Sequence, residues 1–490
     1  MESDLKRKAF SGFLWMFMER IGAQLITFCV SIVLARILFP EDYGVIAIAQ
    51  IFINLMNVFV TQGLNASLIQ RDEAGDLEYS TAFFANLGFS LILYMGIFLS
   101  APFISEYYGN TVLCPILRVM GLRLIIGAFN SIQRAYVSRH LQFKKFFFAT
   151  LGATIISAFV GIGMALAGMG PWAIAGQYLT NAIIGTIVLW FTISWHPKRM
   201  FSKSKFMEMF GFGWKIFIAA FCNELYLELR SLVIAKKYSS SDLAYYIRGK
   251  QFPELFYTNL NATITSVMFP IMSKQKDDLA ALNRNLKRTI QVETYLIMPL
   301  MIGLTAVAEP LVKLLLTDKW LLCVPFLCAY CISYTVLPIQ SILEQLYKAV
   351  GRSDIVLKLF FVEKFVGILV ILYTMHYSVW AIAVGMVCTS LFSTLLHGSQ
   401  MKAILNYSLI QMMKDIFENV VLCLIMYIGV RIVGLLPFSA IIMIIIQCIT
   451  GVIIYLTLSI LIKSKSLKFL LQIINSKMHN SLLIRIENML

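Results

Sequence analysis

Long apolar segments separated by short polar connections run along almost the whole chain. A membrane-spanning helix needs about 20 apolar residues, and by that measure the pattern predicts fourteen spanning helices. The expected fold is an all-α polytopic membrane protein. The predicted helices lie near residues 11–38, 44–66, 81–104, 112–135, 146–168, 171–194, 210–235, 245–272, 290–316, 322–347, 355–376, 379–402, 416–435 and 438–462.

The second apolar segment, residues 44–66, carries a regular polar stripe. An α-helix of about 3.6 residues per turn places side chains spaced by three or four residues on one face. A polar face on an otherwise apolar helix indicates contact with water or with other polar groups inside the membrane. The stripe consists of Gln50, Asn54, Asn57, Thr61 and Asn65.

The same stripe recurs 200 residues further along the chain. Its second copy consists of Lys250, Glu254, Tyr257, Asn261 and Thr265. Other landmarks keep this offset or the same order, among them Asp42 with Asp242, Gln24 with Glu224, and Trp172 with Trp380.

This internal repeat predicts two lobes of six helices each, residues 1–205 and 206–405, followed by two extra C-terminal helices and a tail in 406–490. Because six spans is an even number, the two copies share one orientation, as a parallel repeat about an axis along the membrane normal. The two polar stripes are then expected to face one water-filled central cavity.

Composition supports membrane residence. The chain has 490 residues, of which 59% are hydrophobic and 14% charged, with a mean hydropathy of +0.78; soluble domains are about 25% charged. The nine cysteines stand singly in apolar segments, which argues against a disulfide framework. Cys323, Cys328 and Cys331 have spacings that can accompany metal ligation, but no fourth cysteine lies near them, and we expect no metal site.

Basic residues predict the orientation, because cytoplasmic loops are enriched in Lys and Arg. They cluster at the N-terminus, in alternate connections and in the tail, so both termini are expected in the cytoplasm. This topology explains the net charge of +15 without nucleic acid as a partner. One connection breaks the rule, which favours a role for its cations. These are Lys236, Lys237, Arg248 and Lys250.

The segment Lys274–Arg288 has Leu279, Leu282 and Leu286 on one helical face. Two interpretations remain open: a short helix lying on the lipid headgroups, or a solvated connector between spans.

Charged side chains are costly inside a bilayer unless they face protein or water, so those on helical stripes are candidates for a substrate cavity. Internal pairing (Glu363 with Lys364) and snorkelling at helix ends are alternatives for some of the intramembrane charges. The candidates are Arg20, Gln24, Gln50, Asn54, Asn57, Arg123, Asn130, Arg134, Lys250, Glu254, Tyr257, Asn261, Glu344 and Lys348.

Basic groups suit a phosphate-bearing cargo, and amides and tyrosines suit sugar hydroxyls. Glu224, Glu228 and Glu254 are candidates for coupling transport to H⁺ or Na⁺. No nucleotide-binding G-x-x-x-x-G-K-S/T motif and no H-E-x-x-H motif occurs. We therefore expect a transporter without a cofactor rather than an enzyme.

Short motifs along the chain carry a family resemblance. They are Gly12-Phe13-Leu14-Trp15, the stretch from Leu34 to Gly44, Gln62-Gly63-Leu64 with Ile69-Gln70-Arg71, and Gly170-Pro171-Trp172-Ala173-Ile174. In this order, and with two extra C-terminal helices, the chain resembles the Wzx-type flippases over roughly residues 5–460. These form the polysaccharide-transport branch of the multidrug/oligosaccharidyl-lipid/polysaccharide exporter superfamily, and the colanic-acid type is the most similar.

The resemblance implies two six-helix lobes that alternate between inward- and outward-open states around a cation-lined cavity. It implies a bacterial inner-membrane protein that flips undecaprenyl-diphosphate-linked oligosaccharide from the cytoplasmic to the periplasmic leaflet, for O-antigen, capsule or exopolysaccharide assembly. The implied partners are the lipid-linked oligosaccharide, membrane lipids, and the polysaccharide polymerase with its chain-length machinery.

Two other functions remain open. An ion-coupled multidrug or metabolite antiporter would have a cavity dominated by acidic residues, whereas the candidates here have a basic excess. A membrane-embedded glycosyltransferase or polymerase would have sizeable outer loops, and the predicted outer loops are short.

Overall fold

A computed structural model describes residues 2–62, 64, 67–68, 75–139 and 143–478. Throughout these ranges the regular structure is helical, without a strand, which confirms the predicted all-α fold. One residue of the first stripe and four residues of the sequence motifs lie outside the described residues. These are Asn65, Gly63, Ile69, Gln70 and Arg71.

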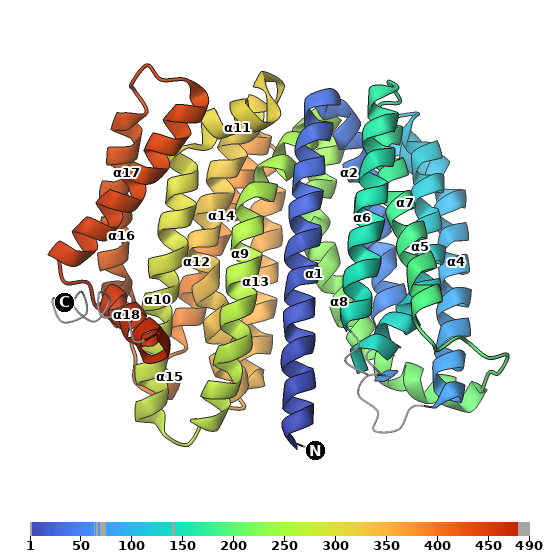
Figure 1. Cartoon of the computed structure of the whole chain (residues 1–490), viewed down its shortest axis with the longest axis horizontal. Helices are drawn as coiled ribbons and strands as arrows, with labels where there is room; N and C mark the ends of the chain where they lie inside the picture. Colours follow the sequence, from blue (N-terminus) through green and yellow to red (C-terminus); the bar gives the residue numbers. More distant parts are fainter. Residues whose placement is uncertain (1, 63, 65–66, 69–74, 140–142, 479–490) are drawn as a thin grey trace. The chain divides into compact units, whose positions relative to one another are not determined.

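The chain forms two compact units, Met1–Ala244 and Tyr245–Leu490. Seven helices with defined bounds follow one another in the described part of the first unit (Figure 1). They are α1 (Glu2–Ile37), α2 (Pro40–Thr61), α4 (Asp76–Tyr108), α5 (Leu113–Arg139), α6 (Phe143–Leu166), α7 (Pro171–Thr192) and α8 (Lys203–Lys237).

The second unit holds the remaining helices, the first of which begins five residues before the boundary between the units. They are α9 (Ser240–Lys274), α10 (Leu279–Ala306), α11 (Ala308–Leu316), the 3₁₀ helix η1 (Asp318–Cys323), α12 (Val324–Ala349), α13 (Ser353–Thr374), α14 (Val379–Ser399), α15 (Lys402–Leu405), α16 (Leu409–Val433), α17 (Ala440–Leu461) and α18 (Lys465–Met478).

Eleven helices in the described part of the chain are long and apolar enough to cross a membrane. The helices α8, α9 and α13 are 35, 35 and 22 residues long and carry several charged side chains, and they are not among the eleven. The chain is therefore a multi-pass membrane protein, and the number of fourteen spans stays a prediction.

The predicted repeat is visible in the helix boundaries. Helix α2 begins at Pro40 and α9 at Ser240, and the preceding helices end at Ile37 and Lys237, in both cases at an offset of 200 residues. Both starts use the same cap. The Asp42 carboxylate accepts a hydrogen bond from the Phe39 backbone N–H at 3.0 Å. The Asp242 carboxylate accepts one from the Ser239 backbone N–H at 3.1 Å.

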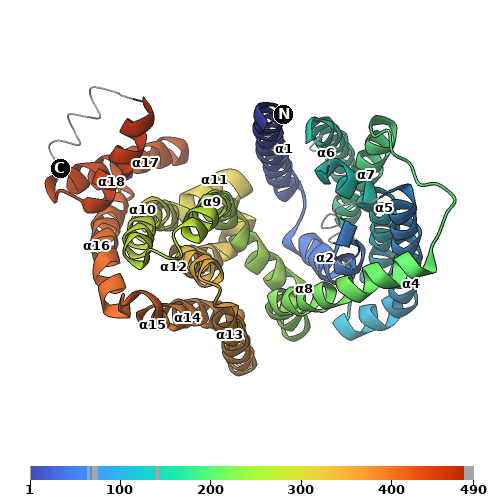
Figure 2. The ribbon, with the colours of Figure 1, turned by 90° about the horizontal axis from the view of Figure 1, so that it is seen from below.

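In the first unit, α2 packs against α4, α5, α7 and α8 (Figure 2). An apolar and aromatic core lies between α4, α5 and the end of α7, and includes Phe83, Ile132 and Leu189. Because α8 packs on α2 and α4, it belongs to the first unit by its contacts. The predicted division at residue 205 follows the repeat instead of these contacts.

In the second unit, α10 and α12 pack side by side; α10 also contacts α16, and α12 contacts α14. The core cluster includes Leu286 of α10, Leu343 of α12 and Leu422 of α16. The polar network described below lies on α12, α13 and α14.

The segment Lys274–Arg288 is not a separate surface helix, because α10 begins at Leu279 and continues into the membrane-spanning stretch. The connector predicted as the alternative is limited to residues 275–278, between the end of α9 and the start of α10. The Asp278 carboxylate caps the start of α10 by accepting the Ala281 N–H at 2.9 Å. Leu282 and Leu286 are fully buried in the core of the second unit, so this part of the apolar face packs on protein rather than on lipid. Leu279, the third leucine of the face, is 50% exposed.

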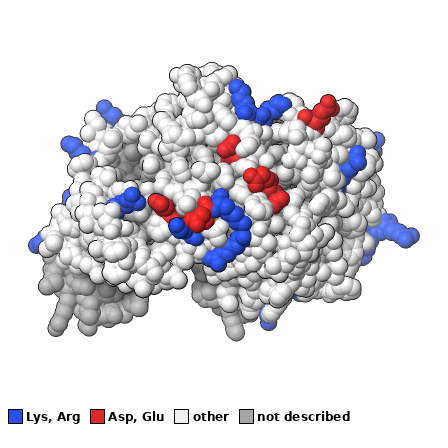
Figure 3. Space-filling model, turned by 90° about the horizontal axis from the view of Figure 1, so that it is seen from above, with Lys and Arg blue, Asp and Glu red and all other residues white. Residues whose placement is uncertain are grey.

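Charged side chains are sparse on the face shown in Figure 3, where small groups of basic and acidic residues stand on a largely uncharged surface. This agrees with the low charged fraction of the chain, 14%.

Candidate functional site

A cavity of about 480 Å³ lies between α2, α5, α6 and α7 of the first unit. The four described residues of the first polar stripe all line it, as the helical spacing predicts. The polar lining consists of Gln50, Asn54, Asn57, Thr61, Arg123, Asn130, Ser131, Arg134, Ser138, Thr150, Tyr178 and Asn181.

A chain of hydrogen bonds crosses the wall of this cavity. Arg123 Nη1 donates to Gln50 Oε1 at 2.7 Å, and Gln50 Nε2 donates to Asn54 Oδ1 at 2.5 Å. Asn54 Nδ2 in turn donates to Glu228 Oε1 on α8, at 3.2 Å. The chain thus links a guanidinium to a carboxylate through two amides. Such networks fix the orientation of their members, because every amide has both its donor and its acceptor engaged.

Helix α7 completes the polar wall. The Arg123 guanidinium lies 5.0 Å from the centre of the Tyr178 ring, a cation–π contact. Asn130 donates to Thr186 Oγ1 at 2.7 Å. These contacts hold the side chains of α5 in place.

Arg123 and Arg134 are the only charged side chains among the described lining residues. Both project from α5, and a separation of eleven residues corresponds to roughly 16 Å along a helix axis. Arg123 is half-buried and already hydrogen-bonded, whereas Arg134 is exposed in the cavity wall. Two guanidiniums among amides and hydroxyls form an environment suited to an anionic, hydroxyl-rich group.

Other first-unit candidates lie elsewhere. Arg20 is exposed and Gln24 half-buried on α1, and neither belongs to the described lining of the cavity. Glu224 and Glu228 lie one turn apart on α8, outside that lining, and Glu228 reaches the cavity wall only through Asn54.

The second stripe lies on α9. Lys250 and Glu254 form a salt bridge of 3.0 Å, with side chains 42% and 40% exposed. The Tyr257 ring stacks on Tyr334 of α12, with ring centres 4.6 Å apart and planes at 3°. Asn261 is half-buried. That this stripe faces the same cavity as the first stays a prediction.

Two of the cations that break the positive-inside pattern have structural partners. The Lys236 ammonium donates to the Tyr107 carbonyl oxygen at 2.5 Å and lies over the Tyr107 ring. Arg248 lies over the Trp320 ring, with the guanidinium carbon 4.9 Å from its centre. These contacts give both cations a role in packing.

Sequence reasoning missed several polar residues of the helices. Tyr178 and Asn181 line the cavity from α7, although their spacing of three residues on an apolar helix was a usable signal. Glu293 on α10 is 1% exposed, and neither carboxylate oxygen has a hydrogen-bond partner among the described residues. His397 on α14 is 2% exposed and lies 3.9 Å from the predicted candidate Glu344.

The profile of a family described as "Polysaccharide biosynthesis protein" matches residues 33–325. The succinoglycan biosynthesis transport protein ExoT of Rhizobium meliloti (strain 1021) is 24% identical over 342 residues, covering 70% of this chain and 69% of ExoT. The lipopolysaccharide biosynthesis protein WzxC of Escherichia coli (strain K12) is 24% identical over 360 residues, covering 72% of each chain.

Among solved structures, the lipid II flippase MurJ matches 92% of this chain and 98% of its own, with a TM-score of 0.73 and 16% identity. An inward-facing multidrug MATE transporter covers 79% of this chain and 96% of its own, with a TM-score of 0.61 and 14% identity. These likenesses concern the fold. Together with the sequence matches, they confirm the resemblance inferred from the motifs. The prediction of a protein that is not an enzyme agrees with the relatives whose names state an activity, since those are transporters or flippases.

Proposed function

This chain belongs to the polysaccharide biosynthesis protein family, and on that premise we propose that it flips undecaprenyl-diphosphate-linked oligosaccharide across the bacterial inner membrane. The cargo moves from the cytoplasmic to the periplasmic leaflet, with both termini of the protein in the cytoplasm. Alternation of the two repeat-related lobes between inward- and outward-open states exposes the cargo site to each side in turn.

The observation that carries this proposal is the cavity of the first unit, with two arginines on one helix and amides around them. A diphosphate and several sugars cannot cross hydrocarbon unaided, because each polar group loses several kcal/mol of hydration there. Guanidinium groups replace that hydration with charge-assisted hydrogen bonds to phosphate oxygens. The amides and hydroxyls of α2 and α7 do the same for sugar hydroxyls.

The two arginines have different tasks in this mechanism. Arg134 is exposed in the cavity wall and meets the diphosphate first. Arg123 is oriented by Gln50 and Tyr178, so its remaining N–H groups point in fixed directions and bind without further ordering. The polyprenyl tail stays in the bilayer while the headgroup is in the cavity.

An ion-coupled drug antiporter is the main alternative. Cationic drugs require carboxylates at the site, but the described lining of the first-unit cavity contains no Asp or Glu. The charge of the lining therefore supports an anionic cargo.

The experiment that tests this function is deletion of the gene in its host, with lipid-linked repeat units measured on each leaflet of spheroplast membranes. The expected result is accumulation on the inner leaflet and loss of surface polysaccharide, both reversed by the intact gene. Unchanged surface polysaccharide, in a strain without a second gene of this family, would contradict the proposal.

A further inference from the structure

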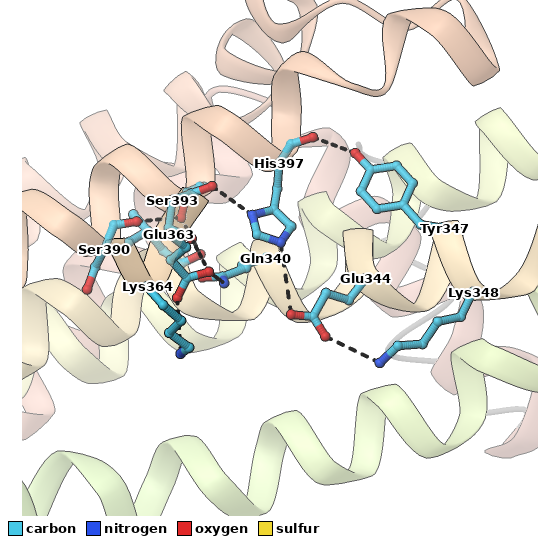
Figure 4. A network of polar contacts seen from close by, with 11 residues as sticks. Gln340, Glu344, Tyr347, Lys348, Glu363, Lys364, Ser390, Ser393 and His397 are labelled. Carbon is cyan, nitrogen blue, oxygen red and sulfur yellow. Dashed lines mark hydrogen bonds and ion pairs between the residues drawn. The ribbon is translucent and has the colours of Figure 1, made fainter. Parts of the chain in front are cut away.

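A polar network joins three helices of the second unit around His397 (Figure 4). His397 comes from α14, Glu344 and Lys348 from α12, and Glu363 from α13. The His397 side chain is 2% exposed, whereas that of Glu344 is 34% exposed. A buried imidazole thus lies behind a partly exposed carboxylate.

The tautomer of His397 is fixed by its surroundings. Its Nδ1 lies 2.9 Å from the Ser393 carbonyl oxygen. Because a carbonyl oxygen only accepts, Nδ1 carries a hydrogen. The Tyr347 hydroxyl donates to the backbone carbonyl of His397 itself, which holds α14 against α12. Nε2 is therefore the ring nitrogen that can gain or lose a proton, and it faces Glu344 Oε1 at 3.9 Å.

Glu344 stands between two possible partners. Lys348, one turn further along α12, donates to Glu344 Oε2 at 3.3 Å. On the other side, a neutral His397 would offer only a lone pair to Oε1, and two acceptors cannot bond to each other. One proton added between His397 Nε2 and Glu344 Oε1 removes this conflict, because it allows an ion pair or hydrogen bond that joins α14 to α12.

Glu363 provides a contrast within the same network. Its Oε2 accepts hydrogen bonds from Gln340 and Ser393, both at 2.9 Å, and its Oε1 lies 3.7 Å from the Lys364 ammonium. Both oxygens of the Glu363 carboxylate thus have partners. The pairing with Lys364 agrees with the alternative considered from the sequence.

A further helix that packs on α14 is α16, whose first half carries Lys414, Asp415 and Glu418. Asp415 already accepts a hydrogen bond of 2.7 Å from the Tyr407 hydroxyl. The groups facing the His397 region are thus Glu344, Lys348 and Tyr347 from α12 and Glu363 with Lys364 from α13.

We propose that His397 and Glu344 share one exchangeable proton and form the protonation site of the second unit. The proton comes from water through the exposed side of Glu344, and its binding changes the charge of the pair from −1 to 0. The unprotonated pair leaves Glu344 with Lys348 on its own helix, whereas the protonated pair ties α12 to α14. Coupling of this switch to cargo movement rests on the proposed function.

The direct test is a pH titration of the purified full chain labelled with ¹⁵N-histidine, followed by NMR. The NMR signal that is absent from the spectrum of the His397→Gln variant is assigned to His397. The spectra are recorded from pH 5 to pH 8. We expect the His397 signals to move with pH in the wild type, because the imidazole carries the shared proton, and to respond to pH differently in Glu344→Gln, because the partner of that proton is then missing.

Matched controls lie nearby. His376→Gln removes a histidine between α13 and α14, and Asp354→Asn removes an exposed carboxylate paired with Arg352 at 2.9 Å; neither should alter the His397 titration. An imidazole that keeps one protonation state over this range, or that titrates identically in Glu344→Gln, would overturn the proposal. If Glu293→Gln abolished the titration while Glu344→Gln left it unchanged, the proton would belong to Glu293 instead.

Transport of lipid-linked oligosaccharide in proteoliposomes tests the coupling separately. A pH gradient should accelerate flipping by the wild-type protein. If the wild-type protein flips cargo at the same rate with and without a pH gradient, the proposed coupling is wrong, whereas the proposed flippase function still holds. Absence of any flipping contradicts the proposed function, while the NMR titration still decides the proton site.

Discussion

The Arg123 guanidinium donates a 2.7 Å hydrogen bond to the Gln50 side-chain oxygen, and this contact ties the basic helix α5 to the polar stripe of α2. It makes one of the two arginines of the cavity part of a fixed frame, since Gln50 is itself bonded to Asn54. A frame of this kind binds an anion without first having to order its own side chains.

The first prediction concerns Arg123. Truncation in Arg123→Ala removes charge-assisted bonds worth about 1.5–3 kcal/mol, so flipping should fall by roughly ten- to a hundredfold at low cargo concentration. The measurement is the initial flipping rate in proteoliposomes.

Arg118→Ala is the matched control on the same helix, because Arg118 packs on Phe98 and donates to its carbonyl oxygen at 3.3 Å, away from the cavity lining. Equal rates for Arg123→Ala and wild type, at equal amounts of inserted protein, would count against the role of Arg123.

The second prediction concerns a substitution at Gly127 that fills the cavity without changing its charge. Gly127 lines the cavity, and a Cβ added there meets only Asn57 Oδ1, at 3.9 Å. We expect Gly127→Ala to flip cargo normally and Gly127→Leu to be strongly impaired, because the larger side chain occupies the space of the headgroup. If Gly127→Leu transports at the wild-type rate, the cargo headgroup does not enter this cavity.

The third prediction compares the roles of Lys250 and Glu254, which form the salt bridge on α9. Lys250→Ala should lower flipping more than Glu254→Gln, because the cation is the partner of a phosphate. Both variants should remain folded and inserted, since an exposed ion pair contributes only about 0–1 kcal/mol to stability. Flipping rates normalised to membrane-inserted protein provide the measurement, and wild-type transport by Lys250→Ala would exclude its part in cargo binding.

The fourth prediction concerns stability at the repeat. A Cβ on Gly44 would lie 1.9 Å from the Ser240 carbonyl oxygen, so Gly44→Ala forces the backbone apart and should destabilise the fold by about 1–3 kcal/mol. Gly88→Ala on α4 meets nothing within 4 Å and should be neutral or slightly stabilising. The measurement is the thermal unfolding of the two purified variants in detergent. If Gly44 is required for this close approach, the Tm should fall in Gly44→Ala and should stay the same or rise slightly in Gly88→Ala.

Local patterns in the sequence were enough to predict the helices, the repeat and one side of the cavity. The spacing of Gln50, Asn54 and Asn57 fixes their common face on α2 through the helical period alone. The caps formed by Asp42 and Asp242 act within three residues of the chain, so both helix starts follow from local sequence.

These local patterns do not predict contacts between helices that are distant in the sequence. The spacing of Leu282 and Leu286 shows that one helix face is apolar, but it does not distinguish a lipid surface from the protein core in which both are buried. Likewise, Tyr178 joins Arg123, and His397 meets Glu344, only through the packing of different helices. The side chains that complete each site are therefore selected by tertiary structure.

The most direct test of the account is the flipping of undecaprenyl-diphosphate-linked oligosaccharide by the purified protein in proteoliposomes, compared with the double variant Arg123→Ala/Arg134→Ala. Accessibility of the sugar to a lectin added outside reports the leaflet. We predict rapid loss of leaflet asymmetry with the wild-type protein and a rate near that of protein-free liposomes with the double variant. Equal flipping by both proteins, or none by the wild type, would contradict the claim that the cavity of the first unit carries the diphosphate.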